Sequence, residues 1–315
     1  MKKRIWIPLV AVLAALALAG GACWLLWPEP GEPTALLQNN IHAAGHTRAA
    51  DLWLEVNGKQ YYRQADGTLA TGFTDIGDQR YYFAEDHTLH TGWLELDGDR
   101  YYMKEDGTMA KGQVTLDGVN HFFIASGKYV LLVNRVNPVP ADYQTEMVKV
   151  ESITVSQDLV EALTEMLAAA RAEGHPCSMC SGYRSYYEQK YIWDRRVGIF
   201  MNEDGYDYGT ACSLAANSIM TPGHSEHQTG LAIDFNDSQY GSIKWLREHA
   251  WEYGFILRYP PNKSHKTDVM YESWHYRYVG KELAKELYES GLCMEEYMEM
   301  LTEHGKIITE QTAQS

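Results

Sequence analysis

Three patterns of apolar and polar positions follow one another along the chain. Residues 5–27 form an almost unbroken apolar run, which is long enough to cross a bilayer as a helix. Residues 51–130 alternate short aromatic segments with Asp-Gly, Asn-Gly and Ser-Gly pairs. Beyond residue 130, Leu159, Leu163 and Leu167 recur at helical spacing, and short β-rich runs follow. The pattern therefore predicts a transmembrane helix, a β-hairpin repeat solenoid and an α+β domain.

The apolar run is preceded by the basic residues 2–4, which should stay in the cytoplasm and place everything after Trp27 outside. A cleaved signal peptide is the competing interpretation, because small residues occur at 17–19. The apolar residues continue past that point, which favours an uncleaved anchor over secretion after cleavage. The predicted segments are a cytoplasmic tail (1–4), a single-pass membrane anchor (5–27) and a linker with a proline-rich start (28–50).

The middle of the chain repeats itself every twenty residues, as the glycines Gly72, Gly92 and Gly112 show. Two aromatic strands joined at an Asx-Gly turn form a hairpin, because both central turn positions favour positive φ. A lone hairpin is marginally stable, so the units over 51–130 are expected to stack and share a core. The repeat aromatics are Trp53, Tyr61, Tyr62, Phe73, Tyr81, Tyr82, Trp93, Tyr101 and Tyr102.

Composition narrows the classes of partner. The 315 residues carry a formal net charge of −15, which argues against nucleic acid, whose affinity rests on Lys and Arg, and against anionic lipid. The chain has 22 Tyr and 9 Trp but only 7 Phe, an excess of amphipathic aromatic side chains that suits surfaces for polar ligands.

The five cysteines are too few for a disulfide scaffold. Cys177 and Cys180 have the spacing of a redox or half-zinc motif, with no second pair to complete it. Three alternatives stay open: a structural disulfide, with the pairing among Cys177, Cys180 and Cys212 undecided, a metal or redox role, and unpaired buried thiols.

The repeats resemble the cell-wall-binding repeats of choline-binding and glucan-binding surface proteins, which share the Gly-Trp, aromatic-pair and Asp-Gly pattern. The resemblance implies that aromatic side chains of neighbouring hairpins hold choline or sugar rings, and cation–π attraction makes a quaternary ammonium ligand chemically sensible. The Gly-Trp position is Phe73 and Gln113 in two units, which departs from the family. The alternative is that the aromatics only build the hairpin core of a spacer.

Three motifs stand in order in the C-terminal half. They are Tyr183-Arg184-Ser185, the Ser-x-His-x-x-Gly-x-Ala-x-Asp pattern over 225–234, and Glu-x-x-His at 272–275. Together they resemble the VanY-type D-alanyl-D-alanine carboxypeptidases, a zinc peptidase family of the bacterial cell wall. The resemblance implies a catalytic domain over 131–305, followed by a tail over 306–315.

The resemblance also implies roles for single residues. His227, Asp234 and His275 would bind Zn²⁺, and two imidazoles with one carboxylate form a catalytic rather than a structural zinc set, since a position stays open for water. Glu272 would be the general base and Arg184 would stabilise the oxyanion. Arg184 would thereby also bind the substrate, and the residues implied at the substrate's terminal carboxylate are Gln189, Ser225 and Tyr259.

The sequence thus predicts a zinc-dependent D,D-carboxypeptidase that removes the terminal D-alanine from peptidoglycan stem peptides. The repeats would bind a wall polymer or glycan and hold the enzyme near its polymeric substrate. An L,D-carboxypeptidase or a peptidoglycan endopeptidase with the same zinc centre is the nearest alternative. A non-catalytic wall-binding surface protein is an alternative of another class.

Overall fold

The computed structural model describes residues 52–140 and 143–313, with side chains up to residue 304. Contacts divide these residues into a small unit, 52–70 with 85–88, and a large unit that contains the rest. The predicted cytoplasmic tail, anchor and linker lie outside the described residues. In the part of the chain that is described, no helix combines the length and apolar character needed to cross a membrane.

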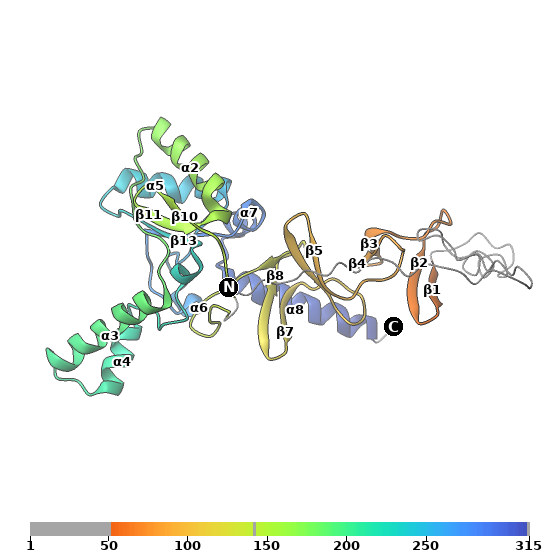
Figure 1. The fold of residues 1–315 in the computed structure, drawn as a ribbon, viewed down its shortest axis with the longest axis horizontal. Helices are drawn as coiled ribbons and strands as arrows, with labels where there is room; N and C mark the ends of the chain where they lie inside the picture. Colours follow the sequence, from red (N-terminus) through yellow and green to blue (C-terminus); the bar gives the residue numbers. More distant parts are fainter. Residues whose placement is uncertain (1–51, 141–142, 314–315) are drawn as a thin grey trace, which may run out of the picture. The chain divides into compact units, whose positions relative to one another are not determined.

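Each predicted repeat forms an antiparallel hairpin, so the prediction of hairpin repeats is confirmed (Figure 1). Asn57 and Gly58 at the first turn have φ of 53° and 74°, the positive values that a two-residue hairpin turn requires. The strands are β1 (Leu52–Val56), β2 (Lys59–Arg63), β3 (Gly72–Ile76), β4 (Gln79–Phe83), β5 (Gly92–Leu96), β6 (Asp99–Met103), β7 (Gly112–Leu116), β8 (Val119–Phe123) and β9 (Tyr129–Val130).

Within the large unit, successive hairpins share a core. The amide of Met109 donates to the carbonyl of Arg80 at 2.8 Å, and the rings of Phe73 and Tyr101 lie 5.0 Å apart. Tyr101, Met103 and Met109 are buried against neighbouring aromatic and aliphatic side chains. The hairpins are therefore stabilised by packing on one another, as expected from the marginal stability of a single hairpin.

The C-terminal half is built around a four-stranded antiparallel sheet in the order β12-β13-β15-β14. Because the sheet is antiparallel and the helices are not crossover connections, the domain is α+β, as predicted. Its elements are β10 (Met147–Val150), β11 (Ile153–Ser156), η1 (Gln157–Leu159), α2 (Val160–Ala172), β12 (Met179–Ser181), α3 (Tyr186–Asn202), α4 (Tyr208–Ala216), η2 (Glu226–Thr229), β13 (Ala232–Phe235), α5 (Tyr240–His249), η3 (Ala250–Tyr253), β14 (Phe255–Leu257), α6 (Ser264–Thr267), β15 (His275–Tyr278), α7 (Lys281–Ser290) and α8 (Met294–Ala313).

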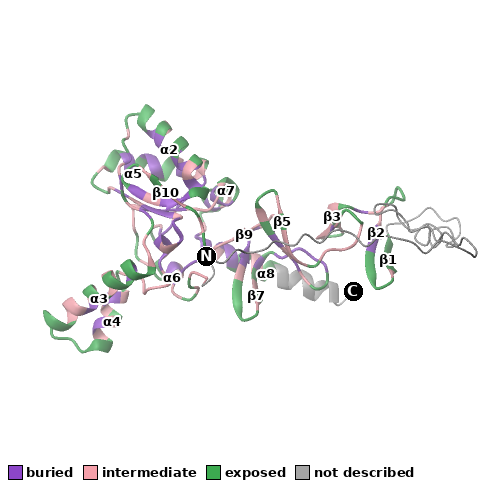
Figure 2. Cartoon of the chain, viewed as in Figure 1, coloured by how far each residue is buried: buried purple, intermediate pink, exposed green. Residues whose placement is uncertain are grey.

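The main core lies between this sheet and α2. Leu159, Leu163 and Leu167 are all buried, as their helical spacing predicts, and they share a cluster with Ile233 and Tyr276 of the sheet. Figure 2 shows the sheet among the most buried parts of the domain. The ends of β13 and β15 are therefore held by a closely packed core.

Helices α3 and α4 lie side by side and pack through Val197, Ala211 and Ala215 (Figure 1). A capping box fixes the start of α3: the amide of Glu188 donates to Ser185 Oγ at 3.2 Å, and the amide of Ser185 donates to Glu188 Oε2 at 2.7 Å. This reciprocal pair satisfies backbone donors that a helix start otherwise leaves free, so the entry angle of α3 is well defined.

The last hairpin shares a core with the C-terminal helices. Phe122 and Ile124 are buried in one cluster with Met294 and Tyr297 of α8. The amide of Ala125 donates to the hydroxyl of Tyr297 at 3.1 Å. The predicted boundary between residues 130 and 131 thus runs through a packed core, and α8 continues to Ala313 within the predicted tail 306–315.

The cysteines within the described residues are free thiols, so the disulfide considered above is not formed among them. Cys177 is buried in the main core, whereas Cys180 is exposed on β12, and the two side chains therefore face different environments. Cys212 is half-buried and Cys293 is buried in the last helices. Burial raises the pKa of Cys177, which disfavours a reactive thiolate at that position.

Candidate active site

Strand pairing brings two of the predicted metal ligands together. Asp234 on β13 lies directly opposite His275 on β15 in the antiparallel register. His227 lies on η2, which precedes β13 and ends at Gly230. Gly230 has φ of 70°, and a Cβ there would lie 2.8 Å from the amide nitrogen of Ser156, so the tight return from η2 into the sheet requires glycine.

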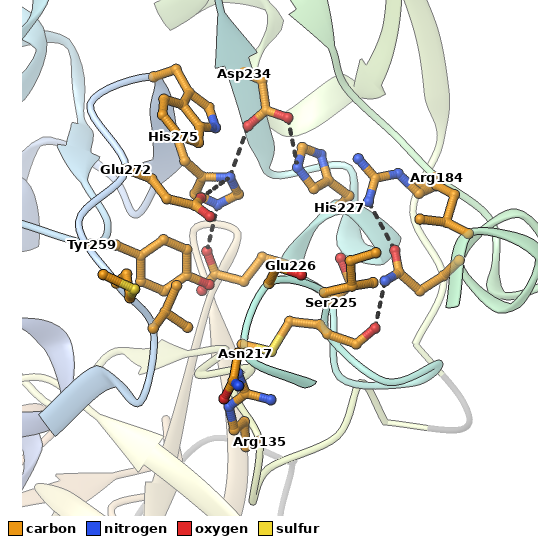
Figure 3. Close-up of a pocket in the computed structure, with 18 residues that line it drawn as sticks. Arg135, Arg184, Asn217, Ser225, Glu226, His227, Asp234, Tyr259, Glu272 and His275 are labelled. Atoms are coloured by element: carbon orange, nitrogen blue, oxygen red, sulfur yellow. Dashed lines mark hydrogen bonds and ion pairs between the residues drawn. The ribbon is translucent and has the colours of Figure 1, made fainter. Parts of the chain in front are cut away.

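The three side chains converge on one point, with one ligand atom of each within 4.8 Å of the others (Figure 3). Asp234 lies between the two imidazoles. Its Oδ2 is 3.2 Å from Nε2 of His227 and its Oδ1 is 2.9 Å from Nδ1 of His275. The sequence motifs, which are far apart in the chain, therefore form a single donor set.

The outer nitrogen of each imidazole has its own partner. Nδ1 of His227 donates to the carbonyl oxygen of Gly182 at 2.7 Å, which leaves Nε2 with its lone pair toward the centre. Nε2 of His275 lies 3.4 Å from Oε2 of Glu226, which turns Nδ1 toward the centre. Metal-binding histidines have this arrangement, with the second nitrogen bonded to a carbonyl or carboxylate, so the donor set fits Zn²⁺.

Charge is concentrated at this donor set. Burial disfavours the carboxylate of Asp234, but its contacts with the imidazoles of His227 and His275 outweigh burial and hold the Asp234 pKa well below its usual range. Burial disfavours the charged form of His275, yet bonds to Asp234 and Glu226 raise its pKa to about 9. Burial lowers the pKa of His227. The carboxylate of Asp234 therefore stays ionised at neutral pH, which suits a cation.

Glu272 lies beside the donor set, with Oε2 4.0 Å from Nδ1 of His275. Its backbone amide donates to the carbonyl of Tyr259 at 3.2 Å, which fixes the segment before β15. Burial raises the pKa of Glu272, so its carboxylate is a stronger base than an exposed one. A proton acceptor thus faces the same cavity as the predicted metal ligands.

Arg184 lies on the other side of the set, next to His227 (Figure 3). Its Nη1 donates to Oε1 of Gln189 at 2.9 Å and its Nη2 donates to Oγ of Ser181 at 3.2 Å. Burial lowers the Arg184 pKa below its ordinary value, but a guanidinium stays charged at neutral pH. Two bonds use only part of the five donors of a guanidinium, so others remain for a ligand.

Gln189 is only 1% exposed, and both ends of its amide are engaged. Oε1 accepts from Arg184, and Nε2 donates to the carbonyl of Met220 at 2.6 Å. The side chain therefore braces Arg184 against the loop before η2. Its predicted contact with the substrate stays a prediction.

Ser225 and Tyr259 line the same cavity, which has a volume of about 270 Å³. Both residues are buried. The ring of Tyr259 lies 5.0 Å from the imidazole of His275. Both hydroxyls are thus placed where a ligand in the cavity can reach them.

A buried charge cluster that no sequence motif predicts lies behind His275. Glu226 accepts from Nε of Arg258 at 2.8 Å and from Nη1 of Arg277 at 2.9 Å. Arg258 also makes a two-pronged ion pair with Glu295 of α8, at 2.6 and 2.9 Å. Glu226 lies between the motif residues Ser225 and His227, and this position is the one sequence signal for it. Arg258, Arg277 and Glu295 are scattered along the chain and resemble surface charges in the sequence.

Arg135 also belongs to no sequence motif, and it lines the cavity from the segment before β10. Its guanidinium donates to the carbonyl of Ala216 and, at 3.0 Å, to that of Asp268, and it pairs with Oδ2 of Asp268 at 2.9 Å. Arg135 therefore ties together two loops at the edge of the cavity.

The repeat aromatics form cross-strand pairs in the same register in successive hairpins. The ring centroids of Trp53 and Tyr62 are 5.2 Å apart, and those of Phe73 and Tyr82 are 5.1 Å apart. Tyr61 and Tyr101 are buried, and Tyr81 is half-buried, so these three serve the hairpin core.

The third hairpin carries an internal cation on its aromatic face. Trp93 pairs with Tyr102 at 5.4 Å, and the guanidinium of Arg100 lies 4.5 Å from the Trp93 ring centroid. The same guanidinium is 5.5 Å from the ring of Tyr129. Part of the aromatic surface of this unit is therefore already covered by a cation of the chain itself.

Comparison with known proteins assigns the C-terminal half. The family model described as VanY, D-alanyl-D-alanine carboxypeptidase, matches residues 152–281. The solved structure of a variant of the vancomycin-resistance D,D-pentapeptidase VanY, in complex with Zn(II), is 40% identical, with a TM-score of 0.50, over 53% of this chain and 97% of that chain. The chain belongs to the VanY family.

Further VanY relatives agree with this assignment. The D-alanyl-D-alanine carboxypeptidase of Enterococcus faecalis (strain ATCC 700802 / V583) is 40% identical over 175 residues, which are 54% of this chain and 65% of that protein. The structure of VanYB in complex with D-alanine-D-alanine is 40% identical, with a TM-score of 0.50, and the match covers 54% of this chain and 96% of that chain. This chain thus spans just under two thirds of the length of the enterococcal relative.

Outside the VanY domain, a model described as a cell wall binding repeat matches residues 91–109.

Proposed function

We propose that this protein is a zinc-dependent D,D-carboxypeptidase that removes the terminal D-alanine from peptidoglycan stem peptides. The observation that carries the proposal is the convergence of His227, Asp234 and His275 within 4.8 Å, beside the carboxylate of Glu272. Membership of the VanY family supports the substrate class. One relative is named a D-alanyl-D-alanine carboxypeptidase, and another was solved in complex with D-alanine-D-alanine.

His227 Nε2, Asp234 and His275 Nδ1 would hold the zinc ion. Zinc bound there supplies Lewis acidity, which polarises a carbonyl and brings the pKa of water toward about 7. Glu272 takes the proton of the attacking water on its carboxylate and passes it to the nitrogen of the leaving D-alanine. The raised Glu272 pKa suits both steps, because the group must accept a proton and then release it.

The remaining groups orient the peptide. Arg184 offers unused N–H donors on the opposite side of the donor set from Glu272, where they stabilise the negative charge that develops on the scissile carbonyl oxygen. The hydroxyls of Ser225 and Tyr259 bind the terminal carboxylate of the substrate. Gln189 contributes to the same end of the cavity, through Arg184 or by direct contact.

The N-terminal segments place the enzyme at its substrate. Residues 5–27 would anchor the chain in the cell membrane with the catalytic domain outside, or would be removed in a secreted form. The repeats would bind a wall polymer or glycan, which raises the effective concentration of the enzyme at peptidoglycan without new active-site contacts. The match of residues 91–109 to a wall-binding repeat supports this role.

The test is to incubate the full chain, loaded with zinc, with a stem pentapeptide that ends in D-alanyl-D-alanine and with the corresponding tetrapeptide. We expect one zinc per chain and release of D-alanine from the pentapeptide. Glu272→Gln should retain zinc and lower the rate by about 10²- to 10⁴-fold. Turnover of the tetrapeptide alone would instead establish an L,D-carboxypeptidase, and zinc-loaded protein without any turnover would establish a non-catalytic wall-binding protein.

A further inference from the structure

A second cleft opens beside the active-site cavity. It has a volume of about 600 Å³ and lies between the β10–β11 turn, β12 and the start of α3. Arg184 and Ile192 line both the cleft and the cavity. Two further cavities in the described residues share no lining residue with the active site. The cleft, in contrast, continues from the reaction centre.

The connection between the cleft and the active-site cavity matters because the cavity is small. A volume of about 270 Å³ is at the lower limit for sites that enclose a drug-sized ligand, so it accommodates the end of a peptide but not the polymer attached to it. On the proposed function, the substrate is a stem peptide joined to a glycan strand. The part of the substrate that is not cleaved must then leave the cavity along a neighbouring surface.

The exposed wall of the cleft is formed by tyrosines. Tyr187 and Tyr191 are one helical turn apart on α3, so they lie on the same face, and they are 81% and 68% exposed. Tyr183, at 37% exposure, lines the cleft next to them. Figure 2 shows the first turns of α3 as largely exposed. Tyrosine offers an apolar ring face and a polar hydroxyl, which suits a ligand that is itself apolar on one side and hydroxylated on the other.

The floor of the cleft is rigid. A Cβ at Gly182 would lie 2.3 Å from the carbonyl oxygen of Thr154, and the amide of Tyr183 donates to the same oxygen at 2.6 Å. The one carboxylate in the lining, that of Glu188, accepts both the amide and the hydroxyl of Ser185 at 2.7 Å. Its capping role makes the cleft better suited to a neutral polar ligand than to a cation.

We propose that this cleft is a subsite for the glycan part of a muropeptide substrate, with a sugar ring on Tyr187 and Tyr191. The proposal rests on the proposed function, because the occupant is identified as the uncleaved end of that substrate. The subsite would let the enzyme distinguish a stem peptide on its glycan from the same peptide free in solution.

The test compares kcat/KM for a free stem pentapeptide with that for the same peptide joined to the peptidoglycan disaccharide. We expect the wild-type full chain to prefer the disaccharide-linked peptide by about tenfold, equivalent to about 1.4 kcal/mol. The double variant Tyr187→Ala/Tyr191→Ala should bring this ratio close to one. Tyr240→Ala removes an equally exposed tyrosine, at 77%, that lines neither cavity, and should keep the wild-type ratio. A wild-type ratio of one, or an unchanged ratio in the double variant, would overturn the proposal.

A binding measurement separates this proposal from the proposed function. Calorimetric titration with the disaccharide alone needs no turnover, and the difference between wild type and the double variant subtracts any sugar bound by the repeats. A site lost in the double variant supports the cleft even if no peptide is cleaved, whereas identical titrations overturn it. Zinc content and thermal stability of the double variant, both expected at wild-type values, show that the active site is intact.

Discussion

Oε2 of Glu226 lies 3.4 Å from Nε2 of His275, so a buried carboxylate supports this proposed metal ligand from behind. The same carboxylate accepts from Arg258 and Arg277, and Arg258 continues to Glu295 on α8. The orientation of the His275 imidazole thus depends on charged side chains from four separate segments of the chain.

Glu226→Gln should therefore lower the affinity for zinc by about 10- to 100-fold, the usual cost of losing an outer partner of a metal ligand. The amide keeps the size of the side chain but removes the charge that orients His275. Competition with a chelator of known affinity measures the effect. Glu299→Gln, which neutralises an exposed α8 carboxylate that pairs with Lys266 of α6, is the matched control and should bind zinc as the wild type does. Equal zinc affinity in Glu226→Gln would show that the cluster serves folding alone.

Arg184→Lys should lower kcat by about 10²- to 10³-fold, because lysine cannot reproduce the guanidinium geometry at the oxyanion. If Gln189 acts by bracing Arg184, Gln189→Leu in the Arg184→Lys background should add little further loss. A double-mutant cycle on kcat/KM measures this coupling. Losses that simply add would favour direct contact between Gln189 and the substrate.

Acid should destabilise the fold partly through Glu295. Burial disfavours its carboxylate, but Arg258 outweighs burial and lowers the Glu295 pKa below its ordinary 4.5. The stabilisation is thus complete above the unfolded-state value of 4.5 and is lost as pH falls through the lower folded-state pKa. Glu295→Gln should be less stable than wild type at pH 7, and the gap in unfolding free energy should narrow below pH 4.5. Denaturant titrations across pH measure it, and a constant gap would contradict the prediction.

The last hairpin should contribute to the stability of the catalytic half. Phe122 is 4% exposed and packs with α7 and α8, so Phe122→Ala should cost about 3 kcal/mol and lower the Tm of that half by about 6 to 12 °C. Phe73 packs within the repeats and is the matched control. Thermal loss of peptidase activity is the measurement. A Phe73→Ala variant that lowers the same transition equally would show that the whole array supports the enzyme.

The hairpin repeats, helix α2 and the residues of the sequence motifs were predictable from sequence. The twenty-residue repeat predicts hairpins because turn glycines and aromatic pairs act locally, and Leu159, Leu163 and Leu167 predict α2 by their spacing. The spatial convergence of His227, Asp234 and His275 follows from motifs whose order is fixed along the chain.

Features that depend on distant partners were not predictable. Arg258, Arg277 and Glu295 look like solvated charges until the fold buries them against Glu226. The packing of α8 on the last hairpin joins residues more than 150 positions apart, as the bond from Ala125 to Tyr297 shows. The local sequence of neither α8 nor the last hairpin indicates which distant segment it packs against, so this contact could not be predicted.

The pairing of Asp234 with His275 across β13 and β15 means that sequence changes in the strands and sequence changes in the cavity loops have different effects on this enzyme. Backbone hydrogen bonds between the strands set the spacing of these two donors, whatever the length of the chain that connects them. The loops at the cavity edge, around Ser218 and Met270, lie outside that ladder. Insertions or substitutions in those loops can therefore alter which peptide is accepted while the spacing of Asp234 and His275 is kept.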